Sequence, residues 1–117
     1  MNVRIKRVYE PRDEHDGKRV LVDRLWPRGL TKEKAGVDLW LKDIAPTTEL
    51  RKWFGHDPAR WGEFQKRYRD ELKKNAGSVL ILKREAQSGA VTLLFGAKDE
   101  QHNEAAVLRS ILKDSTA

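Results

Sequence analysis

The clearest structural signal in the sequence is the segment Val20-Leu21-Val22-Asp23-Arg24-Leu25-Trp26-Pro27-Arg28-Gly29. It opens with a short apolar run and ends in a charged, aromatic turn that proline and glycine interrupt. An apolar run bounded by such residues is typical of a buried strand. We therefore predict a strand over residues 19–23, whose carboxyl end delivers charged side chains to the edge where open α/β sheets bind ligands.

The composition limits the classes of protein to consider. The chain has 117 residues, a length that suits one domain with its own core. It has no cysteine, which excludes disulfides, thiolate nucleophiles and cysteine-bound metals. No apolar run reaches the roughly 18 residues of a membrane-spanning helix, and the chain does not start with a signal-peptide pattern. We therefore expect a cytoplasmic protein.

The charge balance is basic, with 24 Lys and Arg against 18 Asp and Glu, a net charge of +6. This excess favours anionic partners such as phosphates, carboxylates or nucleic acid. Acidic residues are interspersed nearly everywhere, so an ordinary solvated surface is the alternative. We favour that alternative over a nucleic-acid interface, which requires basic charge clustered on one face.

Two further segments, residues 2–8 and 91–95, also have the pattern of strands. The polar segment 9–17 joins the first two strands and is too short for a comfortable crossover helix. Strands 2–8 and 19–23 are therefore expected to be either antiparallel neighbours or parallel strands with a stunted connection.

Helices are predicted between and after these strands. The clearest begins at Asp57-Pro58, because a capping Asp followed by Pro is a strong start signal. Its apolar stripe holds Trp61, Phe64, Tyr68 and Leu72. Capping residues and glycine stops predict the other helical segments: 31–35, 39–41, 47–54, 78–87 and 102–113.

This order of elements predicts the fold class: one small α/β layered domain over residues 1–117, with a few-stranded, mostly parallel central sheet flanked by helices. If strands 19–23 and 91–95 are parallel neighbours, the loops that follow them lie side by side.

Three segments together resemble a known family. They are residues 20–29, Ala45-Pro-Thr-Thr-Glu-Leu-Arg-Lys-Trp-Phe-Gly-His-Asp-Pro58 and Leu93-Leu-Phe-Gly-Ala-Lys-Asp-Glu-Gln-His-Asn103. The segments resemble the YeaO-like proteins, small bacterial domains within a larger family of unknown function, and the similarity covers nearly the whole chain. The resemblance implies a compact α/β domain but no particular reaction.

Cysteines mark a departure from the wider family. More distant relatives carry them in the segment that resembles residues 95–103, whereas this chain has none anywhere. A covalent thiol mechanism is therefore impossible here.

The first candidate site is the turn that holds Asp23, Arg24, Trp26 and Arg28. Arginine offers a bidentate fork for phosphate or carboxylate, and tryptophan offers a stacking face. Asp23 would hold an arginine in place or act as a base. The alternative is an Asp–Arg pair that ties the strand end to a helix, with Trp26 simply packed.

The second candidate is His56, in a glycine-hinged turn before a helix. The helix dipole there favours neutral imidazole, which can act as a base or a hydrogen-bond donor. The alternative is a histidine bonded only to the backbone. Asp57 is expected to cap the helix, and Trp53 and Phe54 are expected in the core.

The third candidate is the loop with Lys98, Asp99, His102 and Asn103, at the start of the last helix. Backbone N–H groups at a helix start favour anions, and these side chains can add charge or orient a ligand. The alternative is that Asp99 or Asn103 caps the helix while Lys98 is solvated.

These observations lead to one hypothesis and two rivals. The hypothesis is an anion-binding pocket for a phosphate- or nucleotide-like molecule, with Asp23 and His56 as the catalytic groups if there is acid–base or hydrolytic chemistry. The rivals are a nucleic-acid-binding module and a protein-interaction domain, the second suggested by the four tryptophans. We expect no cofactor and no metal site, and a monomer or homodimer.

Overall fold

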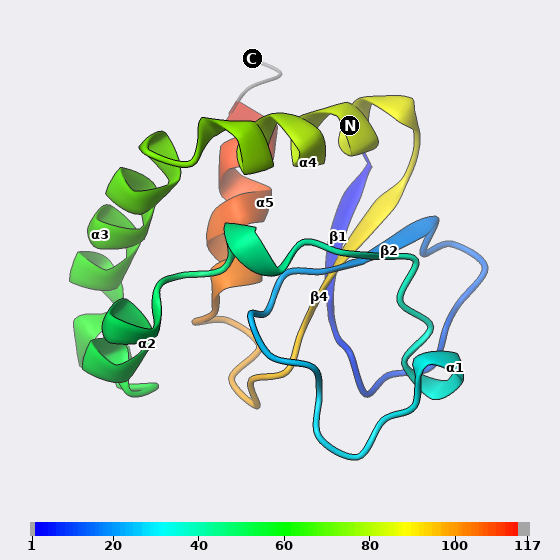
Figure 1. Cartoon of the computed structure of the whole chain (residues 1–117), viewed down its shortest axis with the longest axis horizontal. Helices are drawn as coiled ribbons and strands as arrows, with labels where there is room; N and C mark the ends of the chain where they lie inside the picture. The colour runs from blue at the N-terminus through cyan, green and yellow to red at the C-terminus, as the bar shows by residue number, and fades with distance from the viewer. Residues whose placement is uncertain (1, 115–117) are drawn as a thin grey trace.

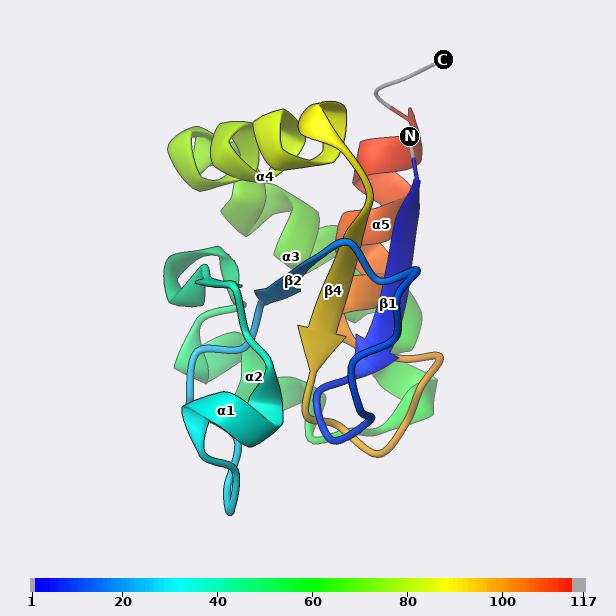
Figure 2. The same cartoon turned by 90° about the vertical axis from the view of Figure 1, so that its right-hand side faces the viewer.

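The computed structural model describes residues 2–114 and contains a four-stranded sheet in which all paired strands are parallel (Figures 1 and 2). The strands are β1 (Val3–Arg7), β2 (Lys18–Leu21), β3 (Leu39–Trp40) and β4 (Val91–Phe95), in the spatial order β1-β4-β2-β3. The helices are α1 (Lys32–Ala35), α2 (Thr48–Phe54), α3 (Trp61–Lys73), α4 (Ala76–Ser88) and α5 (Glu104–Asp114), with 3₁₀ turns η1 (Lys42–Ile44) and η2 (Pro58–Arg60). The predicted small α/β fold is confirmed.

The connection between β1 and β2 settles an alternative that the sequence left open. The two strands are parallel, and β4 lies between them and pairs with both. The stunted parallel connection is therefore confirmed, and the antiparallel pairing is wrong.

The predicted helical piece at 39–41 is also wrong, because these residues form the edge strand β3 and its end. The Asp38 N–H donates to the carbonyl of Arg19 at 2.9 Å, and the Leu41 N–H donates to that of Leu21 at 2.9 Å. The Asp38 carboxylate accepts the Arg19 N–H at 2.9 Å, so it extends the pairing with β2 and caps no helix.

The main core lies between one face of the sheet and the helices (Figure 2). Alternate residues of the strands supply the sheet side, and α5 packs directly on β1 and β4. The predicted stripe of α3 supplies Phe64, Tyr68 and Leu72, all buried. The Tyr68 hydroxyl donates to the Ile44 carbonyl at 2.7 Å, which fixes α3 against η1. No helix within residues 2–114 has the length and apolar character to cross a bilayer.

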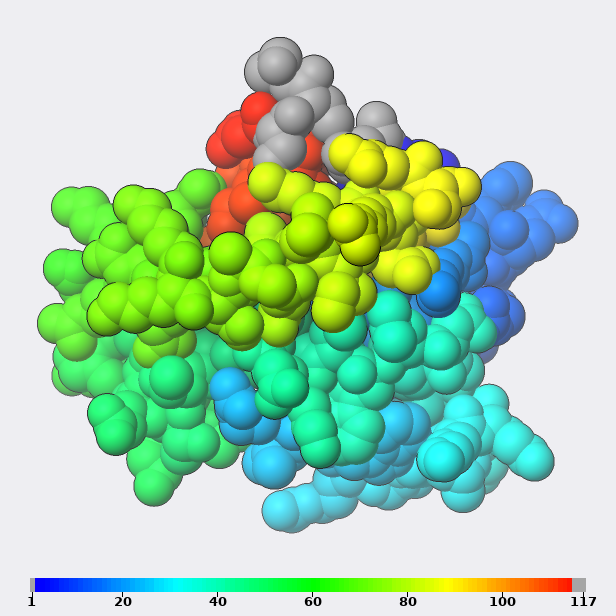
Figure 3. Space-filling view, turned by 45° about the horizontal axis from the view of Figure 1, so that its top comes forward, coloured from blue at the N-terminus to red at the C-terminus, as the bar shows by residue number. Residues whose placement is uncertain are grey.

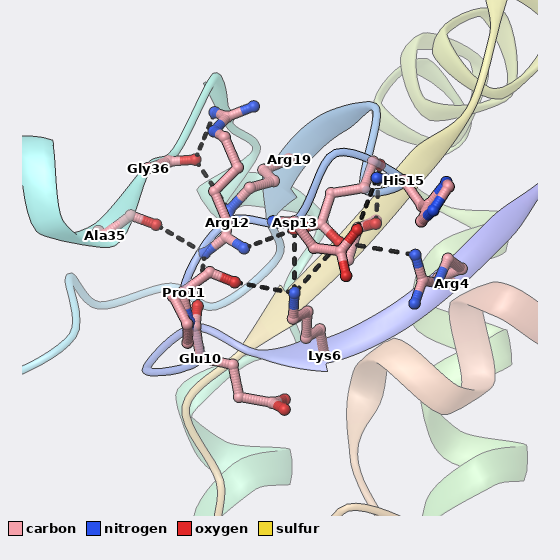
Figure 4. A network of polar contacts seen from close by, with 12 residues as sticks. Arg4, Lys6, Glu10, Pro11, Arg12, Asp13, His15, Arg19, Ala35 and Gly36 are labelled. Carbon is pink, nitrogen blue, oxygen red and sulfur yellow. Dashed lines mark hydrogen bonds and ion pairs between the residues drawn. The ribbon is translucent and has the colours of Figure 1, made fainter.

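Loops and the short α1, in place of long helices, cover the opposite face of the sheet (Figure 2). A completely buried arginine, Arg19 of β2, organises this layer (Figure 4). Its guanidinium donates to the Asp16 carboxylate at 2.8 Å and to the carbonyls of Glu10, Ala35 and Gly36. Arg19 therefore joins the β1–β2 connection to the segment around α1.

Asp16 is the buried acidic partner of Arg19 and also contacts Lys6, at 3.1 Å. Burial raises the pKa of Asp16, but hydrogen bonds from Arg19, the Asp13 N–H and Lys6 outweigh it and hold the pKa below its ordinary value of 3.8. A depressed acid pKa adds stability above the unfolded-state value. That contribution is lost as the pH falls through the folded-state pKa.

We predict that Asp16→Asn destabilises the domain strongly, because it leaves Arg19 buried without a counter-charge. Breaking a buried pair in this way costs about 3–5 kcal/mol. Urea denaturation at neutral pH measures the loss. Asp70→Asn is the control, since its carboxylate is 73% exposed and 3.7 Å from Lys73. Equal effects of the two substitutions would contradict the role given to Asp16.

Candidate functional site

The loops that follow β2 and β4 meet at the carboxyl edge of the sheet. These strands are adjacent and parallel, with Leu21 opposite Leu94. Beyond them, the Gly96 N–H donates to the Asp23 carboxylate at 2.8 Å. A side chain at position 96 would crowd this contact, because a Cβ there would lie 3.0 Å from the carboxylate oxygen. The glycine therefore lets the two loops approach closely.

A cavity of about 240 Å³ opens at this junction. Its walls come from the two loops, the start of α5, α2 and α3, so segments far apart in the sequence contribute. Part of the wall is aromatic or aliphatic, and part is charged or polar. The charged and polar side chains are Asp23, Arg24, Arg51, His56, His102, Asn103 and Glu104.

Asp23 and Glu104 form a hydrogen-bonded pair of carboxyl groups in the cavity wall. Loss of solvent raises the pKa of Glu104 well above its ordinary value of 4.5, and the hydrogen bond with Asp23 and its charge raise it further. Glu104 therefore keeps its proton to a higher pH than an exposed glutamate does.

Two arginines bring positive charge to the cavity. Arg24 is held in place, because its guanidinium donates to the carbonyls of Ala45 at 3.1 Å and Pro46 at 3.4 Å. Arg51, from α2, interacts electrostatically with Glu104. Arg51 is exposed, and its guanidinium makes no hydrogen bond or ion pair with the other residues of the described part of the chain, 2–114. Its five donors are therefore available to a ligand.

The two histidines of the cavity wall differ in how they are held. The Nδ1 atom of His102 lies 2.8 Å from the Asp99 carboxylate, and the ring packs edge-on against Trp61 with centroids 5.2 Å apart. The backbone N–H of Gln101 and the hydrogen bond with His102 lower the pKa of Asp99. An ionised Asp99 favours a proton on Nδ1 and leaves Nε2 as an acceptor. His56 has a left-handed backbone, with φ of 56°.

The structure places five of the nine predicted site residues in the cavity wall, one directly behind the wall and three elsewhere. The five that line the cavity are Asp23, Arg24, His56, His102 and Asn103. Asp99 lies behind His102 and orients it. Asn103 also has the structural role considered above, because its side-chain oxygen accepts the Ala106 N–H at 3.0 Å in the first turn of α5.

Trp26, Arg28 and Lys98 do not line the cavity. Trp26 packs in the small core on the opposite face of the sheet and donates to the Leu30 carbonyl at 2.7 Å. Arg28 and Lys98 are exposed. Asp57 caps η2 by accepting the Ala59 N–H at 3.0 Å, as predicted.

Sequence reasoning missed Glu104 and Arg51. An acid in the first turn of a helix has an ordinary explanation in the helix dipole, so Glu104 gave no functional signal. Arg51 lies among the polar residues of α2, which are expected to face solvent. Its position shortly before His56 in the sequence is the signal that could have identified it. Among the described residues, no three His, Asp or Glu side chains cluster as a metal site.

The fold and the cavity define a class: a small parallel α/β domain with a polar cavity at the carboxyl ends of its strands. The chain belongs to the family DUF488-N3i, described as the inactive DUF488-N3 subclade, which matches residues 2–117. The predicted YeaO-like relationship is confirmed. The uncharacterized protein YeaO of Escherichia coli K12 is 42% identical over 113 residues, which cover 97% of this chain and 98% of that protein.

A mycobacterial relative has a similar identity to this chain over a similar share of its length. The uncharacterized protein Rv3073c of Mycobacterium tuberculosis H37Rv is 44% identical over 110 residues, which cover 94% of this chain and 92% of that protein. No solved structure matches the chain. The comparisons therefore define the family, and the names of these relatives state no activity.

We predict that Glu104→Gln removes a pH dependence of stability. A raised folded-state pKa means that the native state binds more protons than the unfolded chain, so stability falls as the pH rises above about 4.5. The amide keeps the shape and cannot ionise. The free energy of unfolding of the variant, relative to that of the wild type, should therefore increase as the pH rises. Urea denaturation from mild acid to neutral pH measures this difference.

The control is Glu100→Gln, which changes an exposed glutamate in the same loop region. A stability difference between Glu104→Gln and the wild type that stays constant with pH would contradict the assignment of the raised pKa to Glu104.

Proposed function

We propose that this protein binds a small anionic molecule, of a phosphate- or nucleotide-like kind, in the cavity between the loops after β2 and β4. The observation that carries the proposal is that Arg51, an exposed arginine, lines the cavity together with Arg24 and makes no side-chain hydrogen bond with residues 2–114. Arginine binds phosphate and carboxylate through two parallel hydrogen bonds.

The charges of the residues that line the cavity support the binding of an anion. Arg24 and Arg51 contribute two positive charges, and the raised pKa of Glu104 favours its neutral form, which reduces the negative charge of the acid pair. Asp23 is already engaged by the Gly96 N–H, at 2.8 Å. The cavity, at about 240 Å³, is slightly below the usual 300–1,000 Å³ of drug-sized sites, which favours a compact ligand or part of a larger one.

Binding without turnover is the simpler form of the proposal, because the family is described as inactive. Acid–base chemistry by Asp23 and His56 stays a prediction, as does a cytoplasmic location. If there is chemistry, His102 is the better oriented base, since Asp99 holds its Nδ1 atom at 2.8 Å.

The nucleic-acid alternative receives less support from the surface. Two basic residues of η2 and α3 have acidic neighbours: Arg60 lies 3.8 Å from Asp57, and Arg67 lies 3.9 Å from Glu63. Such pairing breaks up a continuous positive face. A nucleic-acid interface predicts steeply salt-dependent binding to mixed oligonucleotides, and a flat titration at low salt would exclude it.

The test is a thermal shift assay with inorganic phosphate, pyrophosphate, nucleoside monophosphates and small carboxylates. A ligand at about 100 times its Kd stabilises the native state by about 2.7 kcal/mol. We predict a rise in Tm with at least one phosphate compound, which Arg51→Gln abolishes without lowering the Tm of the free protein.

Arg28→Gln is the matched control, because Arg28 is exposed and lies outside the cavity. The proposal fails if no compound in the panel raises the Tm, or if Arg28→Gln removes the response while Arg51→Gln leaves it unchanged.

A further inference from the structure

A second hollow lies among α3, α4 and α5 and shares no residue with the cavity. Its volume is about 620 Å³, and α4 lies across the face turned toward the viewer in Figure 3. The floor is wholly aliphatic, from Leu72, Ala76, Val79, Leu80 and Ile111. We call this feature the α4 groove.

Leu80 sets the α4 groove apart from an ordinary packing defect. Its side chain is 48% exposed, although it is large and aliphatic and lies beside a hollow. Single exposed leucines are common on protein surfaces, but apolar side chains that continue into a concave floor indicate a binding surface.

The remaining lining residues of the α4 groove are all cations: Arg69, Lys73 and Lys83. Arg69 is held at the edge by a hydrogen bond to the Ser110 hydroxyl at 3.1 Å. Lys73 has only an exposed pair with Asp70, at 3.7 Å, of a kind worth little in water. An aliphatic floor with a positive rim is complementary to a partner that is apolar in the middle and acidic at its sides.

We propose that the α4 groove binds an acidic amphipathic helix of a partner protein. A helix in a groove inserts apolar residues spaced at i, i+3, i+4 and i+7. Acidic residues on either side of that stripe would face the three cations of the rim. This surface would act separately from the anion cavity, so the two proposals succeed or fail independently.

Other occupants fit the charge and shape less well. In a symmetric dimer through this groove, each cationic rim would meet its own copy and repel it. Single-stranded nucleic acid binds by stacking bases on aromatic rings, and the lining has none. A flat membrane surface does not fill a concave floor. The rim and floor therefore favour an acidic helix.

The probe is a fluorescein-labelled synthetic peptide of roughly 18 residues, long enough to be helical. It carries leucines at helical spacing with glutamates at the flanking positions. A second peptide keeps the leucines and replaces the glutamates with lysines. Fluorescence anisotropy with the full chain should show saturable binding of the acidic peptide, and at least about tenfold weaker binding of the basic one.

The variants come in matched pairs on α4. Leu80→Glu should weaken binding of the acidic peptide by at least about tenfold, whereas Ile81→Glu should not. Ile81 is 46% exposed and lies outside the groove, so it controls for an added charge. Lys83→Glu should weaken binding more than Arg84→Glu, which makes the same change of charge outside the lining.

Several outcomes would overturn the proposal. They are equal binding of the two peptides, no binding of the acidic peptide, or equal effects within each pair of variants. Dimerisation in sedimentation that Leu80→Glu abolishes would assign the groove to a second copy. Binding to oligonucleotides or to anionic vesicles that Leu80→Glu abolishes would assign it to those partners. The two glutamate variants at positions 80 and 81 should show the wild-type circular dichroism spectrum.

Discussion

The buried ion pair between Arg19 and Asp16 is the interaction on which the arrangement of this sheet depends. Parallel strands usually need a crossover of a dozen or more residues, most often a helix, that packs on the sheet. Here the connection between β1 and β2 is shorter and polar, so an apolar helical face is missing. Arg19 compensates by fixing that connection and the C-terminal end of α1 through hydrogen bonds. Thr92 of β4 adds one more, from its hydroxyl to the Asp16 carbonyl at 2.8 Å.

The path of the β1–β2 connection also bears on where the cavity forms. Because the chain passes from β1 to β2 over one face, β4 can enter between them and lie parallel to β2. Two loops with polar sequences then emerge side by side at one edge, where the Gly96 N–H meets the Asp23 carboxylate. The start of α5 adds Glu104, and α2 adds Arg51 from the other side. The buried ion pair therefore lies on one face of the sheet, and the polar site lies at the carboxyl ends of its strands.

Much of the fold follows from local sequence patterns. The site depends instead on the directions in which particular side chains point, which local patterns do not determine. Strands β1, β2 and β4, and the helical segments η2 and α3 after Asp57, follow from apolar runs and capping residues, which act locally. The edge strand β3 depends instead on its pairing with β2. Local patterns do not predict the burial of Arg19, because an arginine in a strand ordinarily faces solvent. A stacking role at the site is predicted for Trp26, yet its indole packs in the small core on the opposite face of the sheet, which is the alternative considered for it. The pairing of Asp23 with Glu104 joins residues far apart in the sequence, which no local pattern can show.

A ¹H–¹⁵N correlation titration of the full chain with inorganic phosphate and a nucleoside monophosphate tests whether the cavity binds anions. We expect the largest shifts on the backbone amides of Arg51, Gly96, Ala97 and His102, which surround the cavity. Shifts confined to the exposed segments around Arg28 and Lys98, or no saturable shift with either compound, would contradict this expectation.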